Sequence, residues 1–174
     1  EDMGNPANLQ AQRGEALLCR AYGHFQLANV FCLAYNPETA DKDMGIPYSI
    51  APETQVKPNY TRGTMKELYE KINDDIEEAL PLVNDEIYSV PKYHFNKKAA
   101  YAFGARFNLY YHNYDKVIEY ANVVLGATPN KMLKNWYNNV MNTASNWDLR
   151  VDLYISASDP SNLLLLPVTS SWGY

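Results

Sequence analysis

The segment from Ala16 to Tyr35 most constrains the fold, because it is apolar nearly all round. Only four polar side chains interrupt it, at Arg20, His24, Gln26 and Asn29. This pattern predicts an α-helix buried on most of its surface. A membrane-spanning helix needs about 20 mostly apolar residues with few charges, and Arg20 would be costly to place in lipid. The segment is therefore predicted to be a core helix of a water-exposed domain.

Arg20 needs a partner in such a helix. A guanidinium is costly to bury unless an opposite charge or several acceptors satisfy it. We expect a carboxylate, or the free carbonyl groups at a helix end, to bind Arg20, and we expect this contact to be structural.

A second helix is predicted from Thr64 to Leu80. Thr64 and Glu67 have the spacing of a capping box, in which each side chain accepts a hydrogen bond from the other residue's backbone N–H. Apolar residues then recur every four positions, at Leu68, Ile72, Ile76 and Leu80. Pro81 is expected to end the helix, because proline lacks the N–H that a helix interior requires.

Charged residues of this second helix predict a solvated face. Glu67 and Lys71, and Lys71 and Asp75, are spaced to pair along it. The carboxylates that follow are Asp74, Asp75, Glu77 and Glu78. We interpret this run as a continuation of the wet face, and not as the acid–base pair of a glycoside hydrolase, which requires two carboxylates facing one cleft.

Residues 99–126 predict a helix, a tight turn at 112–115, and a second helix. Five residues occupy characteristic positions of a 34-residue tetratricopeptide repeat, namely Tyr101, Ala105, Tyr114, Ala121 and Pro129. In such a repeat small residues let two helices touch, aromatic residues fill the groove between repeats, and proline ends the second helix. The helices predicted at 9–34 and 64–80 would form another pair. Together they predict a short α-solenoid of tetratricopeptide-like helical pairs.

The remaining segments predict long loops and a little β-structure near the C-terminus. Residues 34–62 are rich in Pro, Asn and Asp and predict a long connection, and loops of this length are usually functional or partly disordered. Met132 to Met141 is predicted to be helical. Leu149 to Ile155 alternates like a strand, and Asn162 to Val168 has the apolar run of a buried strand. The fold class is therefore mainly α.

Composition excludes several classes of function. The formal net charge of −5 and the isoelectric point of about 5.2 argue against nucleic-acid binding and against a basic membrane-binding patch.

Cys19 and Cys32 would lie roughly 20 Å apart on one helix, beyond the reach of a disulfide, so we expect packed free thiols. The first residues contain no charged region followed by an apolar stretch, so no signal peptide is expected in this chain.

No catalytic or metal-binding pattern is present in the sequence. His24, His94 and His112 lack the spacing of metal ligands. Asp41 to Gly45 begins like a calcium-binding loop, but Ile46 and Pro52 follow where that loop requires glycine and glutamate, so a turn is expected. There is also no glycine-rich phosphate loop and no nucleophile elbow. We expect no enzyme activity, no cofactor and no metal.

The order of these segments resembles the SusD/RagB family of bacterial outer-membrane nutrient-binding lipoproteins. The resemblance covers residues 14–126 and rests on short motifs in a fixed order. These are Gly14-Glu15-Ala16 with Cys19-Arg20-Ala21-Tyr22 and Phe25, Gly45-Ile46-Pro47, Arg62-Gly63-Thr64 before Lys66-Glu67-Leu68-Tyr69, residues 74–80, residues 99–106, and Tyr110 with residues 113–121. The chain departs from the family in the lengthened loop 36–44, and residues beyond 130 match no motif.

The resemblance implies a non-catalytic, cell-surface protein. Residues 1–174 would form a single helical domain within a longer chain, because family members are much longer. An upstream signal peptide with a lipidated cysteine would anchor the protein to the outer membrane. The protein would capture a glycan and deliver it to a SusC-like TonB-dependent transporter. A second hypothesis is a tetratricopeptide-like protein-interaction scaffold with no sugar binding of its own.

The resemblance transfers no ligand-binding residue, because the family's glycan contacts lie in variable loops. Chemistry alone selects Trp147, Trp172 and Tyr174, which lie in Asn- and Ser-rich surroundings outside the clear helices. Aromatic rings offer an apolar face on which a sugar ring can stack. Packing in a core or an interface is the alternative for each of the three.

Overall fold

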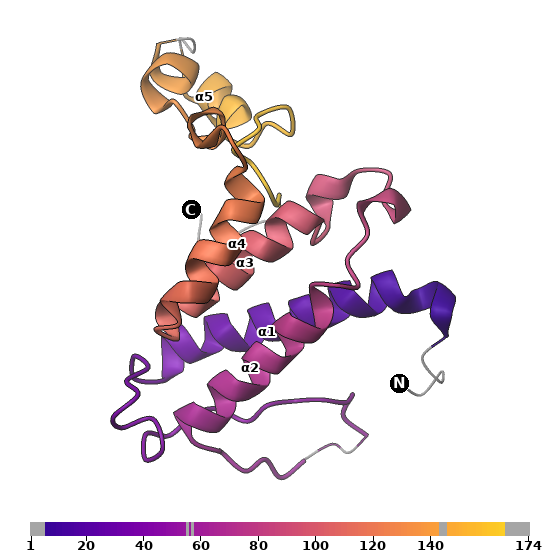
Figure 1. The fold of residues 1–174 in the computed structure, drawn as a ribbon, viewed down its shortest axis with the longest axis vertical. Helices are drawn as coiled ribbons and strands as arrows, with labels where there is room; N and C mark the ends of the chain where they lie inside the picture. The colour runs from indigo at the N-terminus through magenta and orange to yellow at the C-terminus, as the bar shows by residue number, and fades with distance from the viewer. Residues whose placement is uncertain (1–5, 55, 57, 143–145, 166–174) are drawn as a thin grey trace.

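The computed structural model describes residues 6–54, 56, 58–142 and 146–165, and this part of the chain is built from helices (Figure 1). The α-helices are α1 (Gln10–Phe31), α2 (Met65–Ala79), α3 (Lys97–Tyr110), α4 (Tyr114–Leu125) and α5 (Trp147–Tyr154). Short helical turns are η1 (Ala7–Leu9), η2 (Asp85–Ile87), η3 (Pro91–Tyr93), η4 (Pro129–Met132) and the π-turn η5 (Tyr137–Met141). The mainly α fold is confirmed.

Helices α1 and α2 form the first helical pair. The capping box of α2 is present, with the Glu67 backbone N–H donating to Thr64 Oγ1 and the Thr64 N–H donating to Glu67 Oε2. The predicted apolar stripe of Leu68, Ile72, Ile76 and Leu80 is buried. As predicted, α2 ends before Pro81, with Leu80 as its C-cap.

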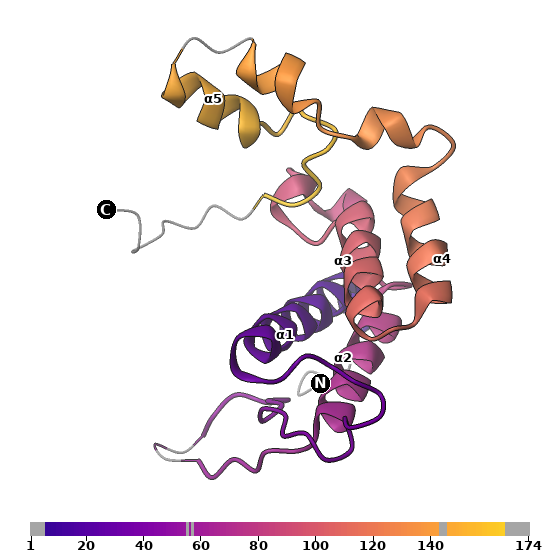
Figure 2. The same ribbon diagram turned by 90° about the vertical axis from the view of Figure 1, so that its left-hand side faces the viewer.

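Helices α3 and α4 form the second pair, which packs across α1 and α2 (Figures 1 and 2). A tight turn joins them, in which His112 adopts a left-handed conformation with φ 62°. A Cβ at Gly104 would lie 3.0 Å from the Tyr120 ring, so the two helices touch where a small residue permits it. The predicted end of this helical pair at residue 126 is confirmed, because Gly126, with φ 59°, is the C-cap of α4. Pro129 lies beyond this end and begins the turn η4, so it does not itself terminate the helix as proline does in the repeat.

Aromatic rings join the two pairs into one core. Phe25 of α1 contacts Phe103, Phe107 and Tyr110 of α3 through edge or tilted ring contacts. Tyr69 of α2 packs on Phe107 as well. The high aromatic content of the chain is therefore used in part for packing between helices.

The prediction that α1 is buried on most of its surface is wrong. One face, which carries Leu18, Ala21 and Phe25, is buried, whereas Val30 and Phe31 are 71% and 67% exposed. Cys19 is a free thiol, as expected. It is also exposed, so the expectation that it is packed is wrong.

The prediction of a solvated face holds for only part of the carboxylate run of α2. Asp74 and Glu78 are exposed, whereas Asp75 is buried and receives two hydrogen bonds of 2.6 Å from the Arg20 guanidinium. Glu77 accepts a hydrogen bond from the Tyr120 hydroxyl, and Glu78 pairs with Arg13. Asp75 and Glu78 therefore connect α2 to α1, and Glu77 connects α2 to α4. The expected carboxylate partner of Arg20 is confirmed.

The predicted β-structure is wrong for the described residues. Residues 149–155 lie in and directly after α5, and no strand forms at 162–165. The only β-pairing described is an isolated bridge between Met44 and Thr64. The predicted helix over 132–141 is reduced to the end of η4 and the turn η5. Residues 166–168 of the predicted second strand lie outside the described residues.

The loop between α1 and α2 is long, as predicted, and residues 37–42 of it form turns. It is fastened to the helices through Tyr48, which stacks on His24 of α1 and donates a hydrogen bond to Asp75 of α2. The Ser49 backbone N–H donates to His24 Nε2. Among the described helices, none combines the length and the apolar character that crossing a bilayer requires.

Candidate functional site

Helix α5 lies at the end of the molecule beyond α3 and α4 (Figure 2). An aromatic groove lies between α5 and η5. Its volume is about 390 Å³. Six residues line it, namely Trp136, Met141, Trp147, Arg150, Val151 and Tyr154. We call this feature the aromatic groove.

Helix α5 supplies one wall of the aromatic groove. Asn146 begins the helix, because its Oδ1 accepts a hydrogen bond from the Leu149 backbone N–H. Residues 147, 150, 151 and 154 then share one helical face by their spacing. Trp147 and Tyr154 are seven residues apart, so they lie about 10 Å apart along the helix axis. Trp147 and Tyr154 therefore lie on the same face of α5, and both line the groove.

The opposite wall begins with Trp136. Its ring stacks on Tyr154, with centroids 5.1 Å apart and planes inclined by 24°. The π-turn η5 follows Trp136 directly. Single π-turns are rare and occur frequently at functional sites. Trp147 makes no such described ring contact and is 74% exposed, so it is the aromatic side chain of the groove most available to a ligand.

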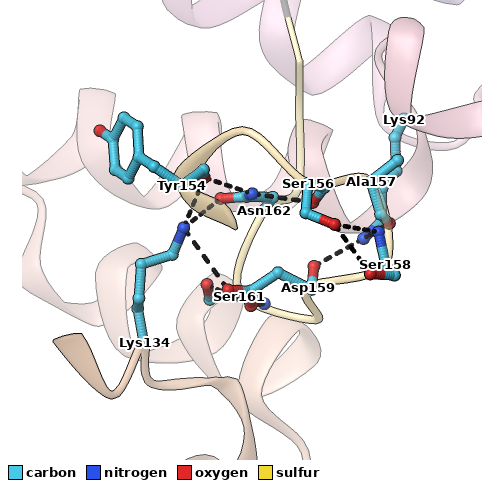
Figure 3. Close-up of polar contacts among 9 residues, drawn as sticks. All are labelled: Lys92, Lys134, Tyr154, Ser156, Ala157, Ser158, Asp159, Ser161 and Asn162. Carbon is cyan, nitrogen blue, oxygen red and sulfur yellow. Dashed lines mark hydrogen bonds and ion pairs between the residues drawn. The ribbon is translucent and has the colours of Figure 1, made fainter. Parts of the chain in front are cut away.

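A polar network holds the segment that follows α5 (Figure 3). Lys134 Nζ donates to the Tyr154 carbonyl at 2.7 Å and to Asn162 Oδ1 at 3.0 Å, and it lies 3.5 Å from Asp159 Oδ2. Lys92 Nζ donates to the carbonyls of Ala157 and Asp159. The loop therefore folds around two ammonium groups, and Lys92 joins it to the residues that precede α3.

Charge in this network favours an ionised Asp159. Ser161 donates to Asp159 Oδ1 from both its hydroxyl and its backbone N–H. These hydrogen bonds, together with the nearby Lys134 ammonium, hold the pKa of Asp159 below its usual range. Asp159 is thus a charged anchor near neutral pH, and not a general acid.

The three sequence-predicted ligand residues have different outcomes. Trp147 lies in the aromatic groove. Trp172 and Tyr174 lie outside the described residues. The sequence patterns did not select Trp136 and Tyr154 as ligand residues, because Trp136 falls in the predicted helix 132–141 and Tyr154 in the predicted strand 149–155. The Asn-rich surroundings of Trp136 were the available signal, since Asn135, Asn138 and Asn142 flank it.

A second cavity of about 340 Å³ lies between α1 and the loop at residues 50–52. Arg13 and Arg20 line it, but Glu78 and Asp75 pair with them. Burial raises the pKa of Tyr48 beside this pair, and its hydrogen bond to Asp75 raises it further. The groups around this cavity therefore stabilise the fold and leave no unpaired charge for a ligand.

Histidines contribute no metal site in the described ranges, where no group of three or more His, Cys, Asp or Glu side chains could hold a metal ion. His94 Nδ1 contacts Glu15 Oε1 at 2.9 Å, and its ring stacks on Tyr88. His24 Nδ1 contacts the Arg20 carbonyl at 2.8 Å. His94 thus contacts α1 through Glu15, and His24 joins α1 to the following loop through Tyr48 and the Ser49 N–H.

Comparison with solved structures shows the same fold in two proteins. One is a SusD superfamily protein from Bacteroides thetaiotaomicron VPI-5482, with 22% identity, a TM-score of 0.65, and coverage of 80% of this chain. The other is a SusD-like carbohydrate-binding protein from Bacteroides vulgatus ATCC 8482, with 20% identity, a TM-score of 0.63, and coverage of 78%. The matches span only 31% and 28% of those two chains. This chain thus corresponds to about a third of either protein.

Sequence comparison identifies the family. No functionally curated protein matches this chain. The model of the SusD-like family, described as starch-binding and associating with the outer membrane, matches residues 1–109. That match spans more than half of the chain and includes α1, α2 and most of α3. The chain therefore belongs to the SusD-like family.

Proposed function

We propose that this protein binds glycans without catalysis and that the aromatic groove is a glycan-binding surface. The observation that carries the proposal is the exposed Trp147 ring beside the stacked pair of Trp136 and Tyr154. Membership in a family described as starch-binding, and the fold shared with a SusD-like carbohydrate-binding protein, support glycan binding by the protein; the family match covers residues 1–109, so the place of the groove rests on its own geometry.

The chemistry of the groove suits a sugar chain. The C–H face of a pyranose ring is apolar and packs on an aromatic face. Because Trp147 and Tyr154 are separated by about 10 Å along α5, a ligand that touches both must extend over more than one sugar ring. Arg150 also lines the groove, and a guanidinium is a type of group that can donate hydrogen bonds to sugar oxygens. The groove therefore suits an oligosaccharide or polysaccharide segment.

Capture and delivery complete the proposal. Residues 1–174 would act as one helical domain of a longer, surface-exposed lipoprotein of the outer membrane. The glycan would pass to a SusC-like TonB-dependent transporter. The family description, which links these proteins to the outer membrane, supports this location. Among the described residues, the groove is lined by aromatic stacking surfaces and one guanidinium, which suit the binding of a sugar chain.

Affinity gel electrophoresis provides the first experiment. The purified protein is run through gels that contain starch or one of several other polysaccharides. We expect retardation by at least one polysaccharide and a smaller retardation of Trp147→Ala. Tyr114→Ala is the matched control, because Tyr114 is an exposed aromatic residue of α4 outside the groove. Retardation by none of the polysaccharides would contradict the proposed glycan binding.

A protein-interaction scaffold is the second candidate function. The exposed apolar residues Leu27, Val30 and Phe31 near the end of α1 favour it, because soluble helices seldom leave such a group uncovered. Co-purification with a SusC-like transporter separates the two functions. Tight transporter binding without any glycan binding would favour the scaffold, whereas glycan binding that depends on Trp147 would favour the first proposal.

A further inference from the structure

We infer that Lys134 is a positioning residue for the aromatic groove, which fixes the stacked pair of Trp136 and Tyr154 without contacting the ligand. The functional meaning of this inference rests on the proposed glycan binding. The structural part of it, that Lys134 fixes the two rings, stands without any ligand.

The ammonium group of Lys134 has no donor left for a ligand. An ammonium carries three N–H donors. Three acceptors surround it, which are the Tyr154 carbonyl, Asn162 Oδ1 and Asp159 Oδ2. The Lys134 side chain is only 11% exposed. Any effect of Lys134 on glycan binding must therefore act through other residues.

The same ammonium contacts both rings of the stacked pair. Lys134 Nζ lies 4.5 Å from the centroid of Tyr154 and 5.9 Å from the centroid of Trp136. With the 5.1 Å between the two centroids, the three centres form a compact triangle. A cation at these distances is attracted to the electron-rich faces of aromatic rings. Each ring is therefore held by its neighbour and by the cation together.

Lys134 also ties the end of α5 to the loop that follows it. It binds the carbonyl of Tyr154, the last residue of α5, and the side chains of Asp159 and Asn162. Asn162 Nδ2 in turn donates to the Tyr154 carbonyl (Figure 3). The backbone of Tyr154 is thus fixed together with its ring, which sets the direction in which that wall of the groove faces.

Loss of the cation should release the ring pair. Lys134→Met keeps a long side chain but removes the charge and all three donors. Without them the rings can reorient, so a sugar meets a wall that is no longer preorganised. We expect the dissociation constant for the glycan to rise roughly tenfold, and Lys134→Arg to recover most of the affinity because a guanidinium also pairs with carboxylates and aromatic faces.

A double-mutant cycle tests this inference by calorimetric titration with the polysaccharide that retards the protein most. Lys134→Met is measured in the wild-type background and in Trp136→Ala. If Lys134 acts through the rings, its loss weakens binding in the first background and has little further effect in the second. Equal weakening in both backgrounds, or unchanged affinity of Lys134→Met, would overturn the inference. Lys131→Met, the removal of an exposed lysine three residues earlier, is the control.

Near-ultraviolet circular dichroism reports the ring pair without a ligand. We expect Lys134→Met, but not Lys131→Met, to lose the aromatic signal that Trp136→Ala also loses. An unchanged signal would overturn the inference even if no glycan binds, which separates its failure from failure of the proposed function.

If Lys134→Met does not fold, Asn162→Ala replaces it, since this variant removes one acceptor and keeps the cation. The same signal should then decrease in part, and a full signal would count against the inference.

Discussion

Two glycines of α1 have opposite surroundings, although both lie inside one helix. A Cβ at Gly14 would lie 2.9 Å from Leu82 Cβ and 3.1 Å from the Ala79 carbonyl oxygen. A Cβ at Gly23 would meet no atom within 4 Å. At Gly14, α1 thus lies too close to the end of α2 for a larger side chain, which gives a physical reason for glycine in the motif Gly14-Glu15-Ala16.

Alanine at these two positions should change stability in opposite directions. We expect Gly14→Ala to lower the free energy of unfolding by about 1–3 kcal/mol, because α1 must move away from α2. Gly23→Ala should raise it by roughly 0.5–1 kcal/mol, because alanine favours the helix and nothing obstructs it. Urea denaturation measures both. Equal effects of the two substitutions would show that the close approach at Gly14 is unimportant.

Arg20 illustrates a charge whose role is structural. Its guanidinium pairs with both oxygens of buried Asp75, and Tyr48 donates to the same carboxylate. We expect Arg20→Met to lower the free energy of unfolding by about 2–3 kcal/mol, because Asp75 loses its partner while Arg20 itself is partly exposed. The glycan dissociation constant should stay within about twofold of wild type. A folded Arg20→Met protein that no longer binds glycan would contradict this role.

At the scale of elements, the start of α2 depends on its capping box. Thr64 Oγ1 accepts from the Glu67 N–H, and Glu67 Oε2 accepts from the Thr64 N–H. Thr64→Ala should lower the free energy of unfolding by about 1 kcal/mol, since a helix N-terminal N–H loses its acceptor. Thr61→Ala, three residues earlier and outside the helix, is the control. Similar urea midpoints for Thr64→Ala and wild type would rule out a stabilising cap.

The four long helices were predictable because their signals are local. The capping box and the four-residue spacing of α2 lie within one segment, and the same is true of the turn at His112. Helix α5 was not predicted, because two local signals conflict. Leu149, Val151, Leu153 and Ile155 alternate as in a strand, whereas Asn146 caps a helix over the same residues.

Long-range contacts explain why the site was only partly predicted. Trp147 was selected from its polar surroundings. Its partners in the groove depend on Lys134, which binds residues 20 to 28 positions later in the chain. Asp75 was placed on a solvated face for a similar reason, since its partner Arg20 is 55 residues away. No local pattern in the sequence specifies either set of contacts.

For the whole molecule, tyrosine burial predicts a specific sensitivity to alkali. Burial raises the pKa of Tyr69 to about 12. Burial and then the hydrogen bond to Glu77 raise the pKa of Tyr120 to about 12. The usual value is 10.0. Below pH 10 both phenols are protonated in the folded and unfolded states, so their contribution to stability is complete. As the pH rises from 10 to about 12 the unfolded state releases these protons first, and stability falls.

Chemical denaturation across this pH range measures the effect. We expect the free energy of unfolding to decrease steadily above pH 10, with tyrosinate absorbance rising together with the loss of helical circular dichroism. Tyr69→Phe should show a shallower decrease, because it removes one of the protons concerned. A Tyr69→Phe profile that is parallel to wild type would contradict the assignment to Tyr69.

The molecule as a whole has two parts. Its helices α1 to α3 lie within or overlap the sequence match to the SusD-like family. The aromatic groove at one end is the proposed glycan-binding site. Calorimetric titration of the wild-type protein and Trp147→Ala, with the polysaccharide that retards the protein most, tests this claim most directly. We predict that the dissociation constant rises about tenfold or more in Trp147→Ala, which is roughly 1.4 kcal/mol of binding free energy, while Tyr114→Ala binds like wild type. Equal affinity of all three proteins would contradict the proposal that the glycan binds in the aromatic groove.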